Sequence, residues 1–204
     1  MRGGVDIDGV LLDFHTPCVA FLNAYFGKQV ALRDIKQYDM WHAYQVSEQA
    51  FIEGVQRFFK TSAFSELRPL PGAVKGVRRL AKQHDLVVPT SRSPDLASIT
   101  KTNLHRYFDG CFQDIHHTTG NMWDVTSSHK GRFCRELGVA CLLEDCVAYA
   151  KAAIQEGIAV VLYKRPWNQY EQLPPFVRRT TWSKMERAIK RTLIRMNGLD
   201  HKLL

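Results

Sequence analysis

Short apolar segments alternate with amphipathic segments from about residue 68 onward, and this alternation limits the possible folds more than any other sequence feature. The segments with the character of strands are 85–90, 111–116, 139–145 and 158–165. The segments with the character of helices are 70–83, 93–108, 127–138 and 146–157. Strands joined through helices by short connections form a parallel sheet covered on both faces. We therefore predict an α/β fold, a Rossmann-like parallel sheet with helices on both faces.

Residues 15–67 do not follow this alternation. Two amphipathic stretches, 19–26 and 47–59, are typical of helices, and Ser47 is a suitable N-cap for the second. The aromatic residues of this region are Phe21, Tyr25, Phe26, Tyr38, Trp41, Tyr44, Phe51, Phe58, Phe59 and Phe64. We interpret the region as a small helical cap inserted after the first strand. The predicted division is an α/β core, residues 1–14 and 68–204, and a cap subdomain, residues 15–67.

The segment "VDIDGV" at residues 5–10 places two carboxylates at the end of an apolar strand. Burying carboxylates without partners is unfavourable, so either a cation binds there or the acids are exposed to solvent. Parallel α/β sheets bind ligands at the carboxyl ends of their strands. The polar residues at the ends of the predicted strands are Asp6, Asp8, Thr90, Glu144 and Asp145. We expect these side chains to face one crevice.

These residue types suit phosphoryl transfer, which depends mainly on positioning and charge stabilisation. Asp6 can attack phosphorus as a nucleophile. Asp6 and Asp145, with a backbone carbonyl near Asp8, can hold Mg²⁺, which prefers oxygen ligands. Asp8 can protonate the leaving oxygen and later activate water. Thr90 offers a hydroxyl donor, and Lys130 offers a positive charge for the transferring group.

Each motif also has a structural interpretation when taken alone. An Asp-x-Asp-Gly sequence is commonly a solvated turn, and residues 90–92 could form a loop that caps the next helix. Lys130 alone would be a surface lysine, and Glu144 with Asp145 could serve only the N-terminus of the following helix. The order and placement of all four motifs, each at a strand end or a helix start, favour the phosphoryl-transfer site.

The motifs "VDIDGV", "LVVPTSR", the lysine of "SSHKGRF" and "CLLEDC" occur in the order found in the haloacid dehalogenase superfamily of phosphohydrolases, which the chain resembles. More narrowly, the chain is similar to the 5′(3′)-deoxyribonucleotidase-like group in "DGVLLDF", "YDMW", "LRPLPGA", the Thr-Ser-Arg of "PTSRSP" and "YKRPWN". The resemblance implies a helical cap after the first strand. It also implies the following roles: Asp6 as nucleophile, Asp8 as acid and base, Thr90, Ser91 and Lys130 as phosphate ligands, and Asp145 with Asp6 and Asp8 at the magnesium ion.

The chain departs from that group at one position of the metal motif. The nucleotidases commonly carry two aspartates where this chain has Glu144 and Asp145. A Glu-Asp pair occurs elsewhere in the superfamily, so metal binding is retained and the substrate class is less defined. Glu144 is then either a metal ligand or a neighbour of one. Two further departures, Ser93-Pro94 and the stretch "HHTTGNMW" at residues 116–123, have no counterpart in that group.

Three further residues are candidates for substrate contacts. Trp41 could stack on a nucleobase, although an aromatic residue in a cap helix is more often part of the core. Arg165 with Trp167 could close one side of the pocket, or could belong to a loop after the last core strand. Arg92 follows the phosphate-binding pair of Thr90 and Ser91 and is assigned to the substrate with them.

Other conspicuous residues are assigned structural roles. On a strand, His116 and His117 would face opposite sides, which disfavours one shared ion, and we interpret them as loop histidines. Cys141 and Cys146 are interpreted as small core residues. The tail from residue 182 is predicted to be an amphipathic helix whose apolar stripe is Met185, Ile189, Leu193 and Ile194, with its basic residues in water.

The composition agrees with a cytoplasmic enzyme. The net charge of +8 favours anionic ligands, and no motif for duplex or single-strand binding occurs, so nucleic acid is a less favoured partner than a small phosphate ester. No apolar run is long enough for a membrane span, and the start of the chain leaves no room for a signal peptide. Five cysteines without a Cys-x-x-Cys motif argue against a disulfide framework. A homodimer is left open.

We therefore predict a magnesium-dependent phosphomonoesterase that forms an aspartyl-phosphate intermediate. The favoured substrate is a nucleoside 5′-monophosphate, with deoxyribonucleotides preferred. The alternatives are a phosphatase of another small ester such as a sugar phosphate, and a phosphatase of nucleic-acid ends or a nucleic-acid-binding protein.

Overall fold

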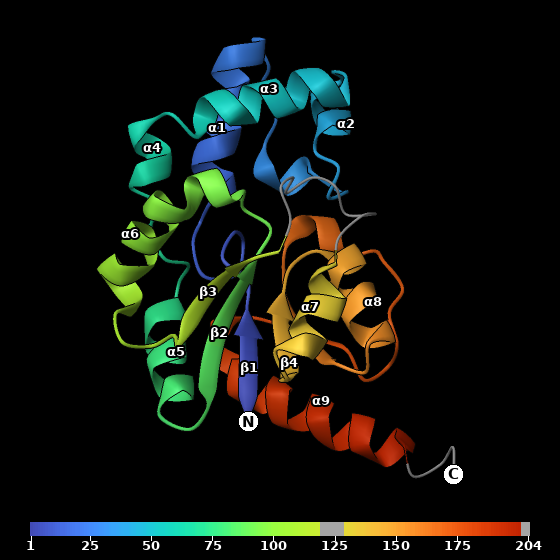
Figure 1. Ribbon diagram of the computed structural model, residues 1–204. Helices are drawn as coiled ribbons and strands as arrows, with labels where there is room; N and C mark the ends of the chain where they lie inside the picture. The colour runs from blue at the N-terminus through green and yellow to red at the C-terminus, as the bar shows by residue number, and fades with distance from the viewer. Residues whose placement is uncertain (119–128, 201–204) are drawn as a thin grey trace.

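The structure, a computed structural model, describes residues 1–118 and 129–200 (Figure 1). In this part of the chain, six strands form one sheet in the order β3-β2-β1-β4-β5-β6, and every neighbouring pair is parallel. The strands are β1 (Arg2–Val5), β2 (Asp85–Thr90), β3 (Asp114–His117), β4 (Val139–Glu144), β5 (Ala159–Tyr163) and β6 (Arg178–Thr180). The predicted Rossmann-like α/β fold is confirmed.

The first strand lies in the middle of the sheet. Arg2 pairs with Asp85 of β2 on one side and with Val139 of β4 on the other. The strand order therefore reverses at β1, and in open parallel sheets this reversal opens a crevice at the carboxyl ends of the strands. The residues that follow β1, β2 and β4 lie at that edge of the sheet.

Helices cover both faces of the sheet, as predicted. One face carries α5 (Ala73–Ala81), α6 (Ala97–Phe108) and α9 (Met185–Asp200), and the other carries α7 (Lys130–Glu136) and α8 (Val147–Gln155) (Figure 1). Short 3₁₀ helices are η1 (Leu32–Asp34), η2 (Pro94–Leu96), η3 (Pro166–Asn168) and η4 (Trp182–Lys184). Buried Leu142 and Val160 pack under α8, whereas Leu143 and Val161 face the other layer, as alternation along a strand requires.

Four helices between β1 and α5 lie over the carboxyl ends of the strands (Figure 1). They are α1 (His15–Phe26), α2 (Trp41–Tyr44), α3 (Glu48–Phe58) and α4 (Ser62–Ser65). The Ser47 hydroxyl accepts the Ala50 N–H at 3.2 Å, which confirms it as the N-cap of α3. Phe58 packs edge-on against Phe14 and Phe64, with ring centroids 5.5 and 5.7 Å apart. We call residues 15–67 the cap, and its status as a separate subdomain stays a prediction.

Two sequence interpretations are wrong. The loop interpretation of His116 and His117 is wrong, because they pair with Pro89 and Thr90 along β2. The predicted strand 111–116 already contained His116, and the observed strand extends to His117. In the C-terminal helix Met185 and Ile189 are buried as predicted, but Ile194 is 71% exposed. Ile194 lies about 100° around the helix from the partly buried Leu193, beyond the edge of the apolar stripe.

Strand β6 was missed because its residues, Arg178 to Thr180, are polar and lie at the edge of the sheet. The start of the predicted helix 127–138 and most of the stretch 116–123 lie outside the described residues. All five cysteines are buried and unpaired, which confirms the core assignment of Cys141 and Cys146. None of the described helices is long and apolar enough to cross a membrane.

Candidate active site

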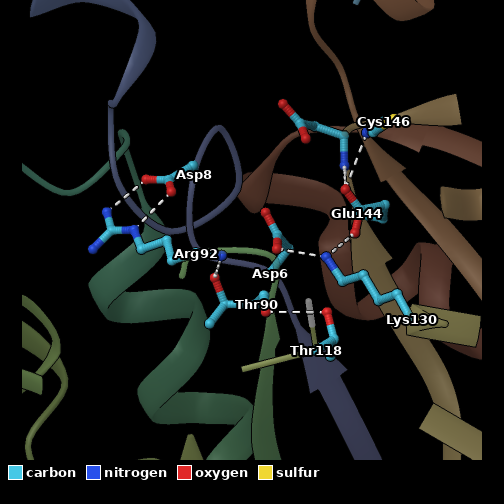
Figure 2. A network of polar contacts seen from close by, with 9 residues as sticks. Asp6, Asp8, Thr90, Arg92, Thr118, Lys130, Glu144 and Cys146 are labelled. Atoms are coloured by element: carbon cyan, nitrogen blue, oxygen red, sulfur yellow. Dashed lines mark hydrogen bonds and ion pairs between the residues drawn. The ribbon is translucent and has the colours of Figure 1, made fainter. Parts of the chain in front are cut away.

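Lys130 joins two carboxylates that come from different strands. Asp6 directly follows β1, Glu144 is the last residue of β4, and Lys130 is the first residue of α7. The Lys130 Nζ donates to Asp6 Oδ1 and to Glu144 Oε2, each at 2.6 Å (Figure 2). All three side chains are at least nine-tenths buried. Burial alone would lower the pKa of Lys130, but the two carboxylates outweigh burial and raise it, so the amine stays charged.

The close packing of α7 on α8 places Lys130 at this point. An added Cβ on Gly131 would lie 2.6 Å from the carbonyl oxygen of Ala152, so only glycine permits this approach. The Lys130 Nζ also lies 4.9 Å from the centre of the Tyr149 ring, which belongs to α8. The lysine that the sequence marked at a helix start is therefore fixed inside the protein and is not a surface residue.

Glu144 and Asp145 stand where β4 passes into α8. Glu144 Oε1 accepts the backbone N–H groups of Asp145 and Cys146 at 3.0 and 3.1 Å, so it serves the helix start and the lysine together (Figure 2). The Asn168 side chain donates to the backbone carbonyl of Asp145 at 2.9 Å. The Oδ2 atom of Asp145 is buried and has no hydrogen-bond partner among the described residues. A buried carboxylate oxygen without a partner is the feature that a bound cation would explain.

The acids at this edge of the sheet fit a magnesium ion. One oxygen from each of Asp6, Glu144 and Asp145 lies within 4.8 Å of the others. Burial raises the pKa of Asp6 to about 7, with Lys130 opposing the rise and Glu144 adding to it. Burial, followed by the charges of Glu144 and Asp6, also raises the pKa of Asp145. Hard carboxylate oxygens that repel one another are suitable ligands for a divalent cation.

Asp8 faces the same crevice from the loop after β1. Its two oxygens accept hydrogen bonds from Arg92, at 2.7 Å from Nε and 2.6 Å from Nη2 (Figure 2). The Thr90 hydroxyl accepts the backbone N–H of Arg92 at 3.2 Å, so its own proton can be donated to a ligand. The structure thus brings Asp6, Asp8 and Thr90 together as expected from their positions at strand ends.

A small cavity lies between these residues and the cap. Its volume is about 20 Å³, and its lining residues are Asp6, Asp8, Phe14, His15, Tyr38, Thr90, Ser91, Arg92 and Tyr149. Four of these were not assigned to the site from the sequence: Phe14, His15, Tyr38 and Tyr149. Phe14 and Tyr38 belong to the motifs "DGVLLDF" and "YDMW", so those motifs contained the signal, whereas nothing in the sequence marked Tyr149.

The remaining candidates lie outside the cavity lining. Trp41 is partly buried and packs against Phe51, with ring centroids 6.1 Å apart. Arg165 is buried, and its Nη2 lies 3.3 Å from the His15 Nδ1. Burial and the charge of Arg165 hold the pKa of His15 well below its ordinary value, so the neutral ring accepts this hydrogen bond. Arg165 thus contacts His15, which lines the cavity. A direct substrate contact of Trp41 or of Arg165 stays a prediction.

Comparisons with known proteins agree with this geometry. The family model of the 5′ nucleotidase, deoxy (Pyrimidine), cytosolic type C proteins (NT5C) matches residues 3–191. The YqfW protein of Bacillus subtilis, whose name marks it as a candidate nucleotidase, is 26% identical over 202 residues, covering 97% of this chain and 100% of that protein.

Solved structures of the haloacid dehalogenase type share the fold. The family protein SP0104 from Streptococcus pneumoniae has a TM-score of 0.67 at 14% identity, covering 92% of this chain and 97% of that one. A hydrolase of this type from Deinococcus radiodurans, with bound phosphate and sodium, has a TM-score of 0.61 at 15% identity, covering 94% and 95%. The chain belongs to the NT5C family of 5′-nucleotidase-like phosphoric monoester hydrolases, within the haloacid dehalogenase superfamily.

Proposed function

We propose that the protein is a magnesium-dependent phosphatase of nucleoside 5′-monophosphates, deoxyribonucleotides among them, and that it acts through an aspartyl-phosphate intermediate on Asp6. The observation that carries the proposal is the buried cluster of Asp6, Glu144 and Asp145 around the Lys130 amine. An anionic nucleophile that attacks a phosphate dianion needs positive charge on both sides of the reacting atoms. This cluster supplies one cation and the ligands for a second.

In the first half-reaction an Asp6 carboxylate oxygen attacks phosphorus, and the bond from phosphorus to the ester oxygen breaks. Asp8 transfers its proton to that oxygen, so the nucleoside leaves as an alcohol and Asp8 becomes a carboxylate. The Thr90 hydroxyl and the Lys130 amine stabilise the charge on the transferring phosphoryl oxygens.

In the second half-reaction water attacks the phosphorus of the aspartyl phosphate. The Asp8 carboxylate accepts a proton from that water, and the bond from phosphorus to the Asp6 oxygen breaks. Inorganic phosphate leaves, and Asp6 and Asp8 regain their starting protonation states. One residue therefore serves as acid and then as base, which requires its carboxyl group to be held in one place.

Asp6 and Asp145 would hold Mg²⁺ through carboxylate oxygens, with Glu144 beside them and Asp8 contributing its backbone carbonyl. The ion would neutralise charge on the phosphate and on the acids. The unpartnered Asp145 Oδ2 supports this assignment from the protein side.

The nucleotide substrate is supported by the family description and by the residues around the cavity. Phe14, Tyr38 and Tyr149 provide aromatic surface beside the catalytic acids, and aromatic rings commonly contact nucleobases. A cavity of about 20 Å³ holds roughly one water molecule. A nucleotide therefore enters only when the cap residues move away from the core. Cap residues that line the cavity, such as Tyr38, would then contact the substrate and determine which substrate is accepted.

The proposal is tested by phosphate release from a panel of monophosphates, each with Mg²⁺ and with excess chelator. The panel contains 5′-deoxyribonucleotides, 5′-ribonucleotides, 3′-nucleotides, sugar phosphates and a 5′-phosphorylated oligonucleotide. We expect the highest kcat/KM with a 5′-mononucleotide and no turnover in chelator. A higher kcat/KM for a sugar phosphate or for the oligonucleotide would contradict the nucleotide assignment. Full turnover in chelator would contradict the requirement for a metal.

A further inference from the structure

Arg92 holds both oxygens of Asp8 in a closed ion pair. Its Nε donates to Oδ2 at 2.7 Å and its Nη2 to Oδ1 at 2.6 Å (Figure 2). The Arg92 side chain is 0% exposed and that of Asp8 is 10% exposed. Two parallel hydrogen bonds from a planar guanidinium fix the direction of a carboxylate as well as its distance. The pair therefore determines where the Asp8 oxygens point.

Two other side chains contact the guanidinium, and two more contact the Arg92 backbone. Its Nη1 lies 3.2 Å from the Thr100 hydroxyl of α6, and its Cζ lies 4.9 Å from the centre of the Phe64 ring in α4. At the backbone, the N–H of Arg92 reaches the Thr90 hydroxyl, and its carbonyl oxygen lies 2.8 Å from the His117 Nδ1. Contacts from the core and the cap thus fix the arginine before any substrate binds.

We infer that Arg92 is a positioning residue for the acid and base of the reaction, and that it acts through Asp8 in place of the substrate contact expected from the sequence. This rests on the proposed function, because it takes Asp8 as the group that exchanges the proton. To act as the acid, Asp8 first takes up a proton from solvent water on an oxygen lone pair that Arg92 does not occupy. When Asp8 gives this proton to the ester oxygen, the resulting carboxylate keeps its two hydrogen bonds from Arg92.

The inference has a consequence for leaving groups. A sugar alkoxide is a poor leaving group and needs the proton from Asp8, whereas p-nitrophenolate leaves without one. Loss of the two hydrogen bonds from Arg92 to Asp8 should therefore slow the first half-reaction far more for alkyl phosphates than for p-nitrophenyl phosphate. A residue that only supports the fold would reduce both reactions by the same factor.

The first test uses Arg92→Lys, which keeps the charge but cannot hold both oxygens. The two substrates are p-nitrophenyl phosphate and the alkyl phosphate that the panel identifies as the best substrate. We expect kcat/KM to fall by about 10–100-fold for the alkyl phosphate and by less than about threefold for the aryl phosphate. Equal losses on the two substrates would overturn the inference.

The second test is a double-mutant cycle with Asp8→Asn. If Arg92 acts only through Asp8, Arg92→Lys should change kcat/KM for the alkyl phosphate by less than about twofold in the Asp8→Asn background. An undiminished loss in that background overturns the positioning role. Failure of the proposed function gives a different result, because Asp8→Asn alone would then leave alkyl phosphate turnover near normal.

Two further variants keep the test decisive if Arg92→Lys does not fold. Thr100→Val removes one partner of the guanidinium while Asp8 and Arg92 stay intact. We expect a smaller loss than for Arg92→Lys, again larger for the alkyl phosphate, and a non-selective loss would overturn the inference. The matched control is Arg79→Lys, because Arg79 forms a half-exposed ion pair with Glu186. This variant should leave kcat/KM unchanged for both substrates.

Discussion

Gly9 lies against the carboxylate of Asp145: a Cβ added to Gly9 would stand 2.1 Å from the Asp145 Oδ2. The backbone at Gly9 also has φ +87°, a conformation that residues with a side chain rarely adopt. The loop after β1, which carries Asp8, therefore depends on Gly9 for its shape and for the room that it leaves to Asp145, the proposed metal ligand.

The first prediction follows from this contact. Gly9→Ala should reduce kcat/KM by about 100-fold or more, because it displaces Asp145 and the Asp8 loop together. Gly27→Ala is the control, since Gly27 has φ +63° but nothing within 4 Å of an added Cβ. The control should lower the melting temperature through strain alone and leave kcat/KM unchanged. Equal activity in the two variants would contradict the importance of the Gly9 contact.

The second prediction concerns the nucleophile. Asp6→Asn should abolish turnover while the protein stays folded, because the amide keeps the shape but cannot form the acyl phosphate. Asp8→Asn should lower turnover of alkyl phosphates by about 10²–10⁴-fold. Rapid-quench trapping of a phosphorylated protein in the wild type, and its absence in Asp6→Asn, is the direct measurement. Turnover in pure Asp6→Asn would rule out covalent catalysis.

The third prediction concerns the metal. Mg²⁺ should raise the melting temperature of the wild type, because it neutralises acids that lie within 4.8 Å of one another. Asp145→Asn should reduce that shift and raise the Mg²⁺ concentration for half-maximal activity by about tenfold or more. Asp114→Asn, at an acid outside the cluster, serves as control. If Mg²⁺ raises the melting temperature of Asp145→Asn as much as that of the wild type, the ion does not bind at Asp145.

The fourth prediction is a pH dependence of stability in metal-free protein. The pKa of Asp6 is about 7 in the folded protein against an ordinary value of 3.8. The folded state thus holds an extra proton, and the stability that this gives is present below about pH 4 and lost as pH rises through 7. In chelator, Asp6→Asn should melt several degrees above the wild type at pH 8 and show a smaller advantage at pH 5. An advantage independent of pH would contradict the raised pKa.

The fifth prediction separates two aromatic residues of the cap. Tyr38 lines the cavity, whereas Trp41 packs against Phe51 away from it. Tyr38→Ala should raise KM for nucleotides by about tenfold or more, as loss of an aromatic contact with a base would. Trp41→Ala should mainly lower the melting temperature. The reverse result would restore the stacking role that the sequence indicated for Trp41.

The sequence predicted the sheet well because periodicity and strand-end position are local properties. The run 85–90 became β2 without change, and the residues Asp6, Thr90 and Glu144 all lie at the crevice because parallel strands end at the same edge. Polar β6 carries no such pattern, so it was missed. His117 was placed in a loop because a short edge strand has too few apolar residues to be recognised.

Contacts across long sequence separations could not be predicted. The sequence does not show that Arg92 donates hydrogen bonds to Asp8, or that Tyr149 of α8 lines the same cavity as Tyr38 of the cap. Arg165 was marked by the motif "YKRPWN", yet its partner His15 follows from the packing of α1 onto η3 alone. Side-chain pairing depends on how elements are stacked, and the sequence pattern gives only which elements exist.

The central position of β1 also governs how the protein is made. Residues 2–5 are synthesised before the other five strands, but Arg2 finds its two neighbours only at residues 85 and 139. Contacts so distant along the chain close slowly, because the entropy of the intervening loop is lost before they form. We therefore expect the strand that presents Asp6 to lack its neighbour on one side until β4 has been synthesised. A nascent chain that ends before Glu144 would carry the proposed nucleophile without the residues of β4 around it.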